Sequence, residues 1–202
     1  FGASFSNDYS VQIDKGIAKQ LKASQKQILT LRVWNENDLV GITTTSDLSD
    51  IGLKNALYQA NLASEYGNKK EKTDFSPLSK HPIKSLDSKK NNPAGIKKLL
   101  NVLRAAESNL LNKHDAIKSI PYNGLSESFF KRVYANSEGA TRSFQNSQAA
   151  LYLYARAEEE NKKPRSSGAV KIGYCLDDID VDACINEAAE KTISHLNYSP
   201  IE

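Results

Sequence analysis

The sequence contains no methionine, one tryptophan and only two cysteines among its 202 residues. Two cysteines are too few for a disulfide framework, and the spacing of Cys175 and Cys184 fits neither a zinc motif nor a redox motif. We therefore expect both to be free thiols, buried or half-buried. Because the chain opens on Phe1 and lacks methionine, we expect it to be a fragment or a processed product.

Long hydrophobic runs are also missing. No apolar run approaches the roughly 18 residues of a membrane-spanning helix, and the first residues do not form a signal peptide pattern. The expectation is therefore a cytoplasmic protein with no membrane partner. The hydrophobic fraction of 39% is compatible with a packed core in one large domain or two small ones.

Positive charge is concentrated in one segment. The net charge is +3, and residues 67–92 alone contain seven lysines and three acids, a net of +4. This lysine-, serine- and proline-rich composition is typical of a flexible linker. Nucleic-acid binding needs arginines and aromatic residues on a folded face, so we expect nucleic acid to be an unlikely partner.

Motifs for catalysis and for metal or phosphate binding are absent. The three histidines, His81, His114 and His195, are far apart, and the chain has no HExxH, GxxxxGK, GxGxxG or GxSxG motif. Neither cysteine has a neighbouring histidine to activate it. We therefore predict no catalytic, cofactor-binding or metal-binding residue in this chain.

Two acidic groups require separate consideration. Glu158–Glu160 is a contiguous run, which is more typical of a solvated strand end than of a cation site. Asp177, Asp178, Asp180 and Asp182 have some of the spacing of a calcium loop but lack its glycine and its closing glutamate. Acidic residues before a helix are also favoured by the helix dipole, so we favour that interpretation.

The first 66 residues predict strands followed by a helix. Residues 27–34 alternate in polarity, residues 39–45 are rich in β-branched side chains, and the four turn-forming residues between them indicate a hairpin. Residues 9–14 and 17–23 flank a Lys-Gly pair and suggest a second hairpin, although 17–23 fits a helical turn equally well.

A helix is expected next, with Ser49 as its N-cap, Asp50 in its first turn and Leu48 packed on Leu53. Apolar residues then recur every three or four positions and predict its buried face: Leu53, Ala56, Leu57, Ala60 and Ala63. Gly67 is the expected C-terminal cap.

Beyond the linker, Asn92-Pro93 predicts the start of a helix that extends to about Asn112. Alternating patterns over 126–137 and 141–157, with a turn between them, and over 169–175 predict antiparallel strands. The periodicity from Ile185 to Leu196 predicts a final helix that starts near Asp180 or Asp182.

The expected fold class is therefore α+β, with antiparallel sheets whose helices pack on one face. We expect two subdomains, 1–66 and 93–198, separated by the linker 67–92.

Four motifs in order resemble the TldD/PmbA family, also called modulators of DNA gyrase. They are TTTSDLS at Thr43–Ser49, YNGxSE at Tyr122–Glu127, FxxxxxANSxG at Phe129–Gly139, and AEEEN at Ala157–Asn161. The SDLS form resembles the PmbA branch more than TldD. The resemblance spans about Ser10 to Leu196 and favours a strand for residues 17–23.

This resemblance implies a cytoplasmic protein about twice as long, which acts on unfolded peptides as a homodimer or as a heterodimer with another family member. TldD-type members carry a zinc peptidase site, HExxxH plus a cysteine, in their C-terminal half, and the PmbA type is degenerate there. None of those residues matches a position here. The resemblance therefore implies a non-catalytic N-terminal portion, with zinc in the absent C-terminal domain or in the partner. The alternative is a stand-alone peptide- or protein-binding adaptor without peptidase activity.

The interpretation of Ser49 as a helix cap, not a nucleophile, predicts the effect of replacing it. Ser49→Ala removes an acceptor for a backbone N–H, so we expect a loss of about 1 kcal/mol in the free energy of unfolding. Urea denaturation of the chain measures this loss. Peptidase activity of a full-length protein is expected to be unchanged, and its loss in a folded Ser49→Ala variant would contradict the interpretation.

Overall fold

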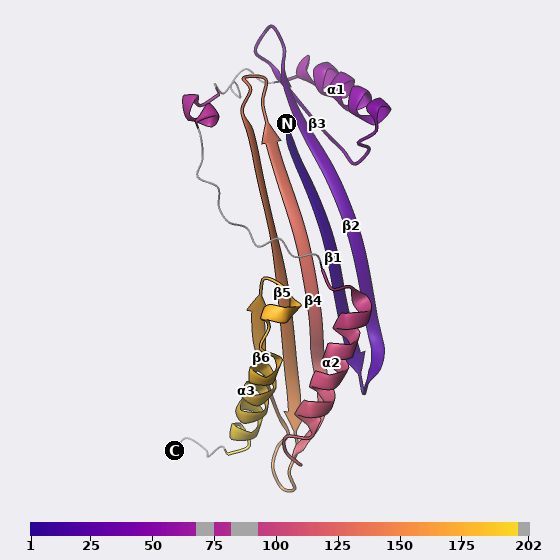
Figure 1. Cartoon of the computed structure of the whole chain (residues 1–202), viewed down its shortest axis with the longest axis vertical. Coiled ribbons are helices and arrows are strands. Elements are labelled where there is room, and N and C mark those ends of the chain that lie inside the picture. The colour runs from indigo at the N-terminus through magenta and orange to yellow at the C-terminus, as the bar shows by residue number, and fades with distance from the viewer. Residues whose placement is uncertain (68–74, 82–92, 198–202) are drawn as a thin grey trace. The chain divides into compact units, whose positions relative to one another are not determined.

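The computed structural model describes residues 1–67, 75–81 and 93–197. Its described residues form one six-stranded antiparallel sheet in the order β3-β2-β1-β4-β5-β6, accompanied by three α-helices (Figure 1). The strands are β1 (Gly2–Asp14), β2 (Ile17–Trp34), β3 (Val40–Thr45), β4 (Ile117–Ala135), β5 (Thr141–Ala157) and β6 (Arg165–Gly173). The helices are α1 (Asp50–Ser64), α2 (Ile96–Leu111) and α3 (Val181–Ser194).

The α+β class is confirmed, but the prediction of separate sheets in two subdomains is wrong. All six strands belong to a single sheet. β1, β2 and β4 extend beyond the bounds that their local patterns indicated, whereas β5 has the predicted bounds. None of the helices within the described residues combines the length and apolar character needed to cross a bilayer.

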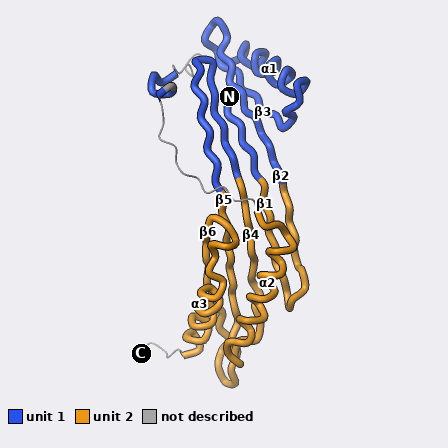
Figure 2. The backbone as a smooth tube through the Cα atoms, in the orientation of Figure 1, with its two compact units in different colours: residues 1–6, 25–88, 130–146 blue, residues 7–24, 89–129, 147–202 orange. Residues whose placement is uncertain are grey.

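The backbone divides into two compact units, each described by itself below (Figure 2). Unit 1 comprises residues 1–6, 25–88 and 130–146, and unit 2 comprises residues 7–24, 89–129 and 147–202. The four long strands contribute residues to both units. The boundaries 1–66, 67–92 and 93–198 remain a prediction, and most of the expected linker lies outside the described residues.

The turn between β1 and β2 confirms the hairpin predicted there. Lys15 and Gly16 have φ angles of 51° and 75°. Positive φ at both central residues is the requirement of a type I′ turn, whose twist matches that of the flanking strands. Residues 17–23 are therefore strand, not helix, and they continue without a break into the strand predicted at 27–34.

In unit 1, the second predicted hairpin is also confirmed, and α1 follows it. β2 pairs with β3 from Leu29↔Thr45 to Trp34↔Val40. The Ser49 hydroxyl accepts a hydrogen bond from the Gly52 N–H at 3.1 Å, as expected of an N-cap.

The buried face of α1 differs from the predicted stripe. Leu53 and Leu57 are 36% and 55% exposed. The residues that are buried are small: Gly52, Ala56, Ala60 and Ser64. The helix lies so close to β3 that a Cβ added to Gly41 would be 1.8 Å from the Ala60 carbonyl oxygen. Leucines do not fit such a contact, so they are turned outward.

The expected glycine cap of α1 is also wrong. The helix ends at Ser64, with Glu65 as its C-cap in a right-handed helical conformation. Gly67 instead allows close packing on β3, because a Cβ there would be 2.4 Å from the Val40 carbonyl oxygen.

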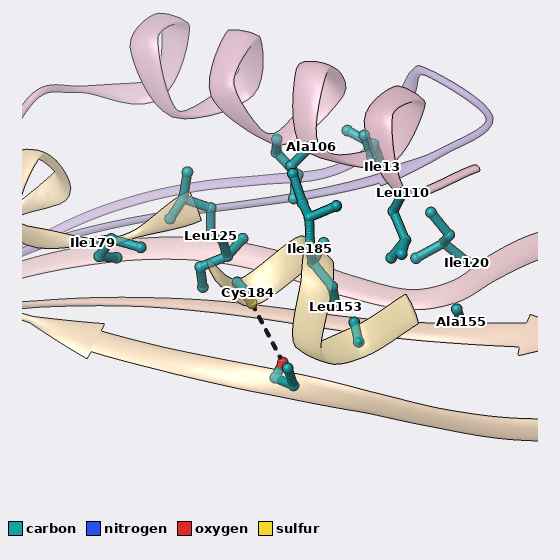
Figure 3. Packing of buried hydrophobic residues seen from close by; sticks show 14 of the residues in the cluster. Ile13, Ala106, Leu110, Ile120, Leu125, Leu153, Ala155, Ile179, Cys184 and Ile185 are labelled. Atoms are coloured by element: carbon teal, nitrogen blue, oxygen red, sulfur yellow. Dashed lines mark hydrogen bonds between the residues drawn. The ribbon is translucent and has the colours of Figure 1, made fainter. Parts of the chain in front are cut away.

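In unit 2, α2 and α3 cover one face of the sheet. Leu110 of α2, Ile185 of α3 and Leu153 of β5 meet in a core that also contains Ile13 and Leu125 (Figure 3). The apolar periodicity predicted for α3 is confirmed, and α2 buries an apolar stripe of its own that includes Leu103 and Leu110.

The predicted start of α2 is wrong, whereas the predicted N-cap of α3 is confirmed. α2 begins at Ile96 after Gly95, whose φ of 81° few other residues tolerate, so Pro93 lies outside the helix. Asn92 is outside the described residues. α3 is capped as expected by Asp180, which accepts a hydrogen bond from the Ala183 N–H at 2.8 Å.

Candidate functional site

The motif Tyr122–Glu127 lies in β4 and forms part of the framework of unit 2. Asn123 is 3% exposed, and its side chain pairs with the backbone of Ile13. Its Oδ1 accepts from the Ile13 N–H and its Nδ2 donates to the Ile13 carbonyl, both at 3.0 Å. The Asn123 side chain thereby makes the two hydrogen bonds that the backbone of a paired strand would make to Ile13. Gly124 leaves room for the Tyr152 ring, which a Cβ would approach to 2.5 Å.

Glu127 joins three separate segments. It is 4% exposed, and its carboxylate accepts hydrogen bonds from the Ala94 N–H at 2.5 Å and the Leu176 N–H at 2.7 Å. Ala94 precedes α2, and Leu176 lies in the 3₁₀ turn before α3. One β4 carboxylate thus holds the approaches to both helices.

A second buried carboxylate, which the sequence did not reveal as special, is Glu107 in α2. It accepts hydrogen bonds from the Lys15 N–H at 3.2 Å and the Gly16 N–H at 2.6 Å. Arg104 donates its Nε–H to the Gly16 carbonyl at 2.8 Å. The sequence feature that could have indicated its role is an acidic residue next to the apolar stripe of α2, directly after Ala106. Both buried carboxylates are engaged with backbone donors.

The acidic run after β5 makes ion pairs. Glu158 accepts from Arg156 Nε at 2.8 Å, and Glu159 pairs with Lys162 Nζ at 2.7 Å. The hydrogen bond from Lys162 lowers the pKa of Glu159 below its ordinary value. Glu160 is exposed. These contacts match a strand end at the surface.

The remaining candidate ligands do not converge. Asp177 pairs with Lys98 at 2.8 Å. His114 Nδ1 accepts from the Ala116 N–H at 3.0 Å, and His195 is the C-cap of α3. Within residues 1–67, 75–81 and 93–197, no three histidine, cysteine or acidic side chains form a group that could hold a metal ion.

Both cysteines are free thiols, as predicted, with Cys175 half-buried and Cys184 buried. Cys184 Sγ lies 3.7 Å from the Ala169 carbonyl oxygen, the dashed contact in Figure 3. Burial raises the pKa of Cys184 to about 11, so the thiol stays protonated and unreactive at neutral pH.

The sheet face of unit 2 opposite the helices carries exposed apolar side chains. In β6, Ala169 is in the core and Lys171 bonds Glu187 of α3 at 2.6 Å, so both face the helices. Alternate residues of a strand point to opposite faces. Val170 and Ile172 therefore lie on the other face, where they are 48% and 66% exposed.

Residues from three further strands extend this surface. The two-residue turn at 15–16 places Ala18 opposite buried Ile13, so both side chains point toward α2. Ile17 and Leu21 point the opposite way from Ala18 along β2 and therefore lie on the face away from α2. Tyr122 and Gly124 share one face of β4, and Tyr152 and Tyr154 share one face of β5, because residues two apart in a strand point the same way. The Tyr152 ring lies next to Gly124 on the face away from the helices, so Tyr122 and Tyr154 lie on that face too. The exposed residues that we call the open face are Ile17, Leu21, Tyr122, Tyr154, Val170 and Ile172.

Two sheet edges in unit 2 have no strand partner among the described residues: the outer edge of β6, which ends the sheet, and part of the outer edge of β2. β2 lies between β1 and β3, but β3 pairs only with Leu29–Trp34. The outer edge of β2 over Ile17–Ser24 is therefore available. Lys19 and Lys22 are exposed on this stretch. Lysines discourage uncontrolled pairing of an edge strand with other sheets.

Unit 1 contains a groove of about 980 Å³. Its walls include Arg32 and Trp34 of β2, and Tyr134 of β4. Residues 75–81 lie at this groove. The Phe75 ring meets the Trp34 ring edge-on, with centroids 5.8 Å apart.

Arg142 of β5 holds the other end of residues 75–81. Its guanidinium donates to the carbonyl of Ser79 and to the carbonyl of His81, the latter at 2.6 Å. Among the described residues, the indole N–H of Trp34 and the hydroxyl of Ser79 are buried and find no hydrogen-bond partner. An unsatisfied buried polar group costs about 1–3 kcal/mol, so this contact is less stable than its packing alone would make it.

The described residues form an α+β sheet with the helices of unit 2 on one face, and sequence comparison identifies the family of the chain. Residues 89–196, more than half of the chain, match the sequence model of the PmbA/TldA metallopeptidase central domain. The chain therefore belongs to the PmbA/TldD metallopeptidase family. No curated protein sequence matches the chain.

Solved structures share the fold at low sequence identity. A candidate modulator of a DNA gyrase from Thermotoga maritima has a TM-score of 0.83 and 18% identity, with 100% of this chain and 45% of that chain covered. TldE from Thermococcus kodakarensis has a TM-score of 0.77 and 16% identity, with 95% and 43% covered. A candidate modulator of DNA gyrase from Bacteroides thetaiotaomicron has a TM-score of 0.77 and 13% identity, with 100% and 46% covered. The chain thus spans less than half the length of these relatives.

The role of Glu127 as a framework carboxylate predicts a graded loss of stability. Glu127→Ala leaves two backbone N–H groups without an acceptor, and we expect it to lower the free energy of unfolding by about 2–4 kcal/mol. Glu127→Gln keeps one acceptor oxygen and is expected to lose about half as much. Urea denaturation followed by circular dichroism measures both, with Glu160→Ala, at an exposed glutamate, as the control. Equal stability of the Glu127→Ala and Glu160→Ala variants would refute the role.

Proposed function

We propose that this chain is the non-catalytic N-terminal portion of a TldD/PmbA-type metallopeptidase, which holds unfolded peptides on their way to a zinc site elsewhere in the full-length protein or in its partner. The available outer edge of β2 is the observation that carries this proposal. An extended peptide can add to such an edge as a further strand.

Strand addition suits a substrate of variable sequence. The bonds are made by the backbone, which every peptide shares, and side-chain pockets add only preference. The unpaired length of β2, Ile17–Ser24, accommodates a peptide of similar length. Lys19 and Lys22 add an attraction for acidic side chains.

The buried carboxylates support a framework role for the chain. Glu107 and Glu127 already accept two backbone hydrogen bonds each. A general base must be within hydrogen-bond reach of a substrate proton, and both carboxylates are buried, each only 4% exposed. We assign catalysis to the remainder of the protein for this reason.

The proposal is tested by comparing a full-length protein with this 202-residue chain on an unstructured peptide, with and without a metal chelator. We expect cleavage by the full-length protein, or by its complex with a TldD-type partner, and loss of that cleavage with chelator. The chain alone is expected to bind the peptide without cleaving it. Chelator-sensitive cleavage by the chain alone would contradict the proposal.

The open face supports a further part of the proposal, that the full-length protein forms a homodimer or a heterodimer with another family member. Six exposed large side chains from four strands lie on this face. Exposed apolar residues that gather on one face are typical of a protein-binding surface. The SDLS sequence at 46–49 favours the PmbA branch, and hence a TldD-type partner.

Substitution of Ile172 tests this assignment. Ile172 is 66% exposed, so Ile172→Glu is expected to leave the stability of the chain unchanged and to weaken the full-length dimer about tenfold or more by placing a charge in the interface. Sedimentation velocity measures the dimer. Leu57→Glu, a change at an exposed leucine of α1, is the matched control. An intact dimer in the Ile172→Glu variant would exclude this face.

A further inference from the structure

Residues 75–81 contact the groove of unit 1 in the way that a bound peptide would. An aromatic side chain, Phe75, packs on Trp34 at one end. Two main-chain carbonyls, those of Ser79 and His81, accept hydrogen bonds from the Arg142 guanidinium at the other. The sheet thus recognises one ring and two backbone groups in this segment.

The segment fills only part of the space available. The groove of about 980 Å³ is lined by Phe75, Ser76 and Ser79 on one side and by strand residues on the other. The remaining lining includes the polar side chains of Thr30 and Arg32 in β2 and of Asn136 just after β4. A longer peptide therefore has room and hydrogen-bonding groups beyond those that the segment uses.

The fit of the segment is also incomplete. The Trp34 indole N–H and the Ser79 hydroxyl are both buried at this contact, and the part of the chain that the structure describes offers neither a hydrogen-bond partner. A ligand that brings a carbonyl to the indole N–H removes one of these defects. A bound peptide can therefore compete with the segment, even though the segment has the advantage of being tethered.

We propose that the groove of unit 1 is a peptide-binding site, and that residues 75–81 are its tethered occupant, which an unfolded peptide with an aromatic side chain displaces. The peptide class rests on the proposed function. The site itself rests on the contacts of Phe75, Trp34 and Arg142. Recognition of one ring and two carbonyls requires little of the peptide sequence.

The test uses a fluorescein-labelled peptide with the sequence FSPLSKH, identical to residues 75–81, added to the 202-residue chain. Phe75→Ala releases the tethered occupant, so we expect the affinity for the labelled peptide, measured by anisotropy, to rise about tenfold. This factor corresponds to a docked state that outweighs the undocked state by about ten to one. If Phe75 has only a structural role, its removal leaves the affinity unchanged or lowers it.

Trp34 is the only tryptophan in the sequence, so its emission reports directly on the groove. We expect a red shift in the Phe75→Ala variant and its reversal by unlabelled FSPLSKH, but not by ASPLSKH. Leu78→Ala is the matched control, because Leu78 is in the same segment and is 70% exposed. It should bind as the unsubstituted chain does. Phe75→Leu is expected to be intermediate and serves if the alanine variant does not fold.

The two proposals fail separately. Unchanged peptide affinity in the Phe75→Ala variant, or Trp34 emission that does not respond to peptide, overturns the tethered occupant and leaves the peptidase role standing. A full-length protein that cleaves no peptide overturns the peptidase role, while tighter binding of FSPLSKH by the Phe75→Ala variant still supports the groove.

Discussion

Buried backbone N–H groups must find acceptors, and in unit 2 a few side chains of β4 and α2 supply them. Glu127 serves the segments before α2 and α3, Asn123 serves β1, and Glu107 serves the turn between β1 and β2. These bonds hold the helices against strands from distant parts of the chain. The core between α2, α3 and the sheet depends on that arrangement, because its apolar residues come from α2, α3, the turn before α3 and the strands β1, β4, β5 and β6.

The same arrangement determines which surfaces remain available. Both helices of unit 2 lie on one face of its sheet, so the opposite face and the outer edge of β2 are left without helical cover. An apolar open face favours a folded partner, whereas an unpaired edge favours an extended peptide. The groove of unit 1 adds a third kind of surface, in which aromatic packing is combined with donors for backbone carbonyls.

Local patterns predicted most elements because each depends on neighbouring residues. The Asp180 cap, the β1–β2 turn and the stripes of α2 and α3 follow from spacing alone. The buried face of α1 was mispredicted because it depends on Gly41, a residue of another element that admits only small side chains. Glu127 was recognised as part of a family motif, but its function as an acceptor required knowing that Ala94 and Leu176 come to it. Nothing in the spacing of Trp34, Phe75 and Arg142 indicated that they share a groove.

The sequence by itself determined the α+β class, the family resemblance, the free cysteines and the location of most helices and strands, since periodicity and capping act over a few residues. Only the tertiary structure decided that the strands form one sheet, which face they leave open and which edge they leave unpaired. Those features arise from contacts between residues up to about a hundred positions apart, such as Asn123 with Ile13. The free energy of such contacts depends on the path of the whole backbone. A pattern of neighbouring residues carries no information about that path.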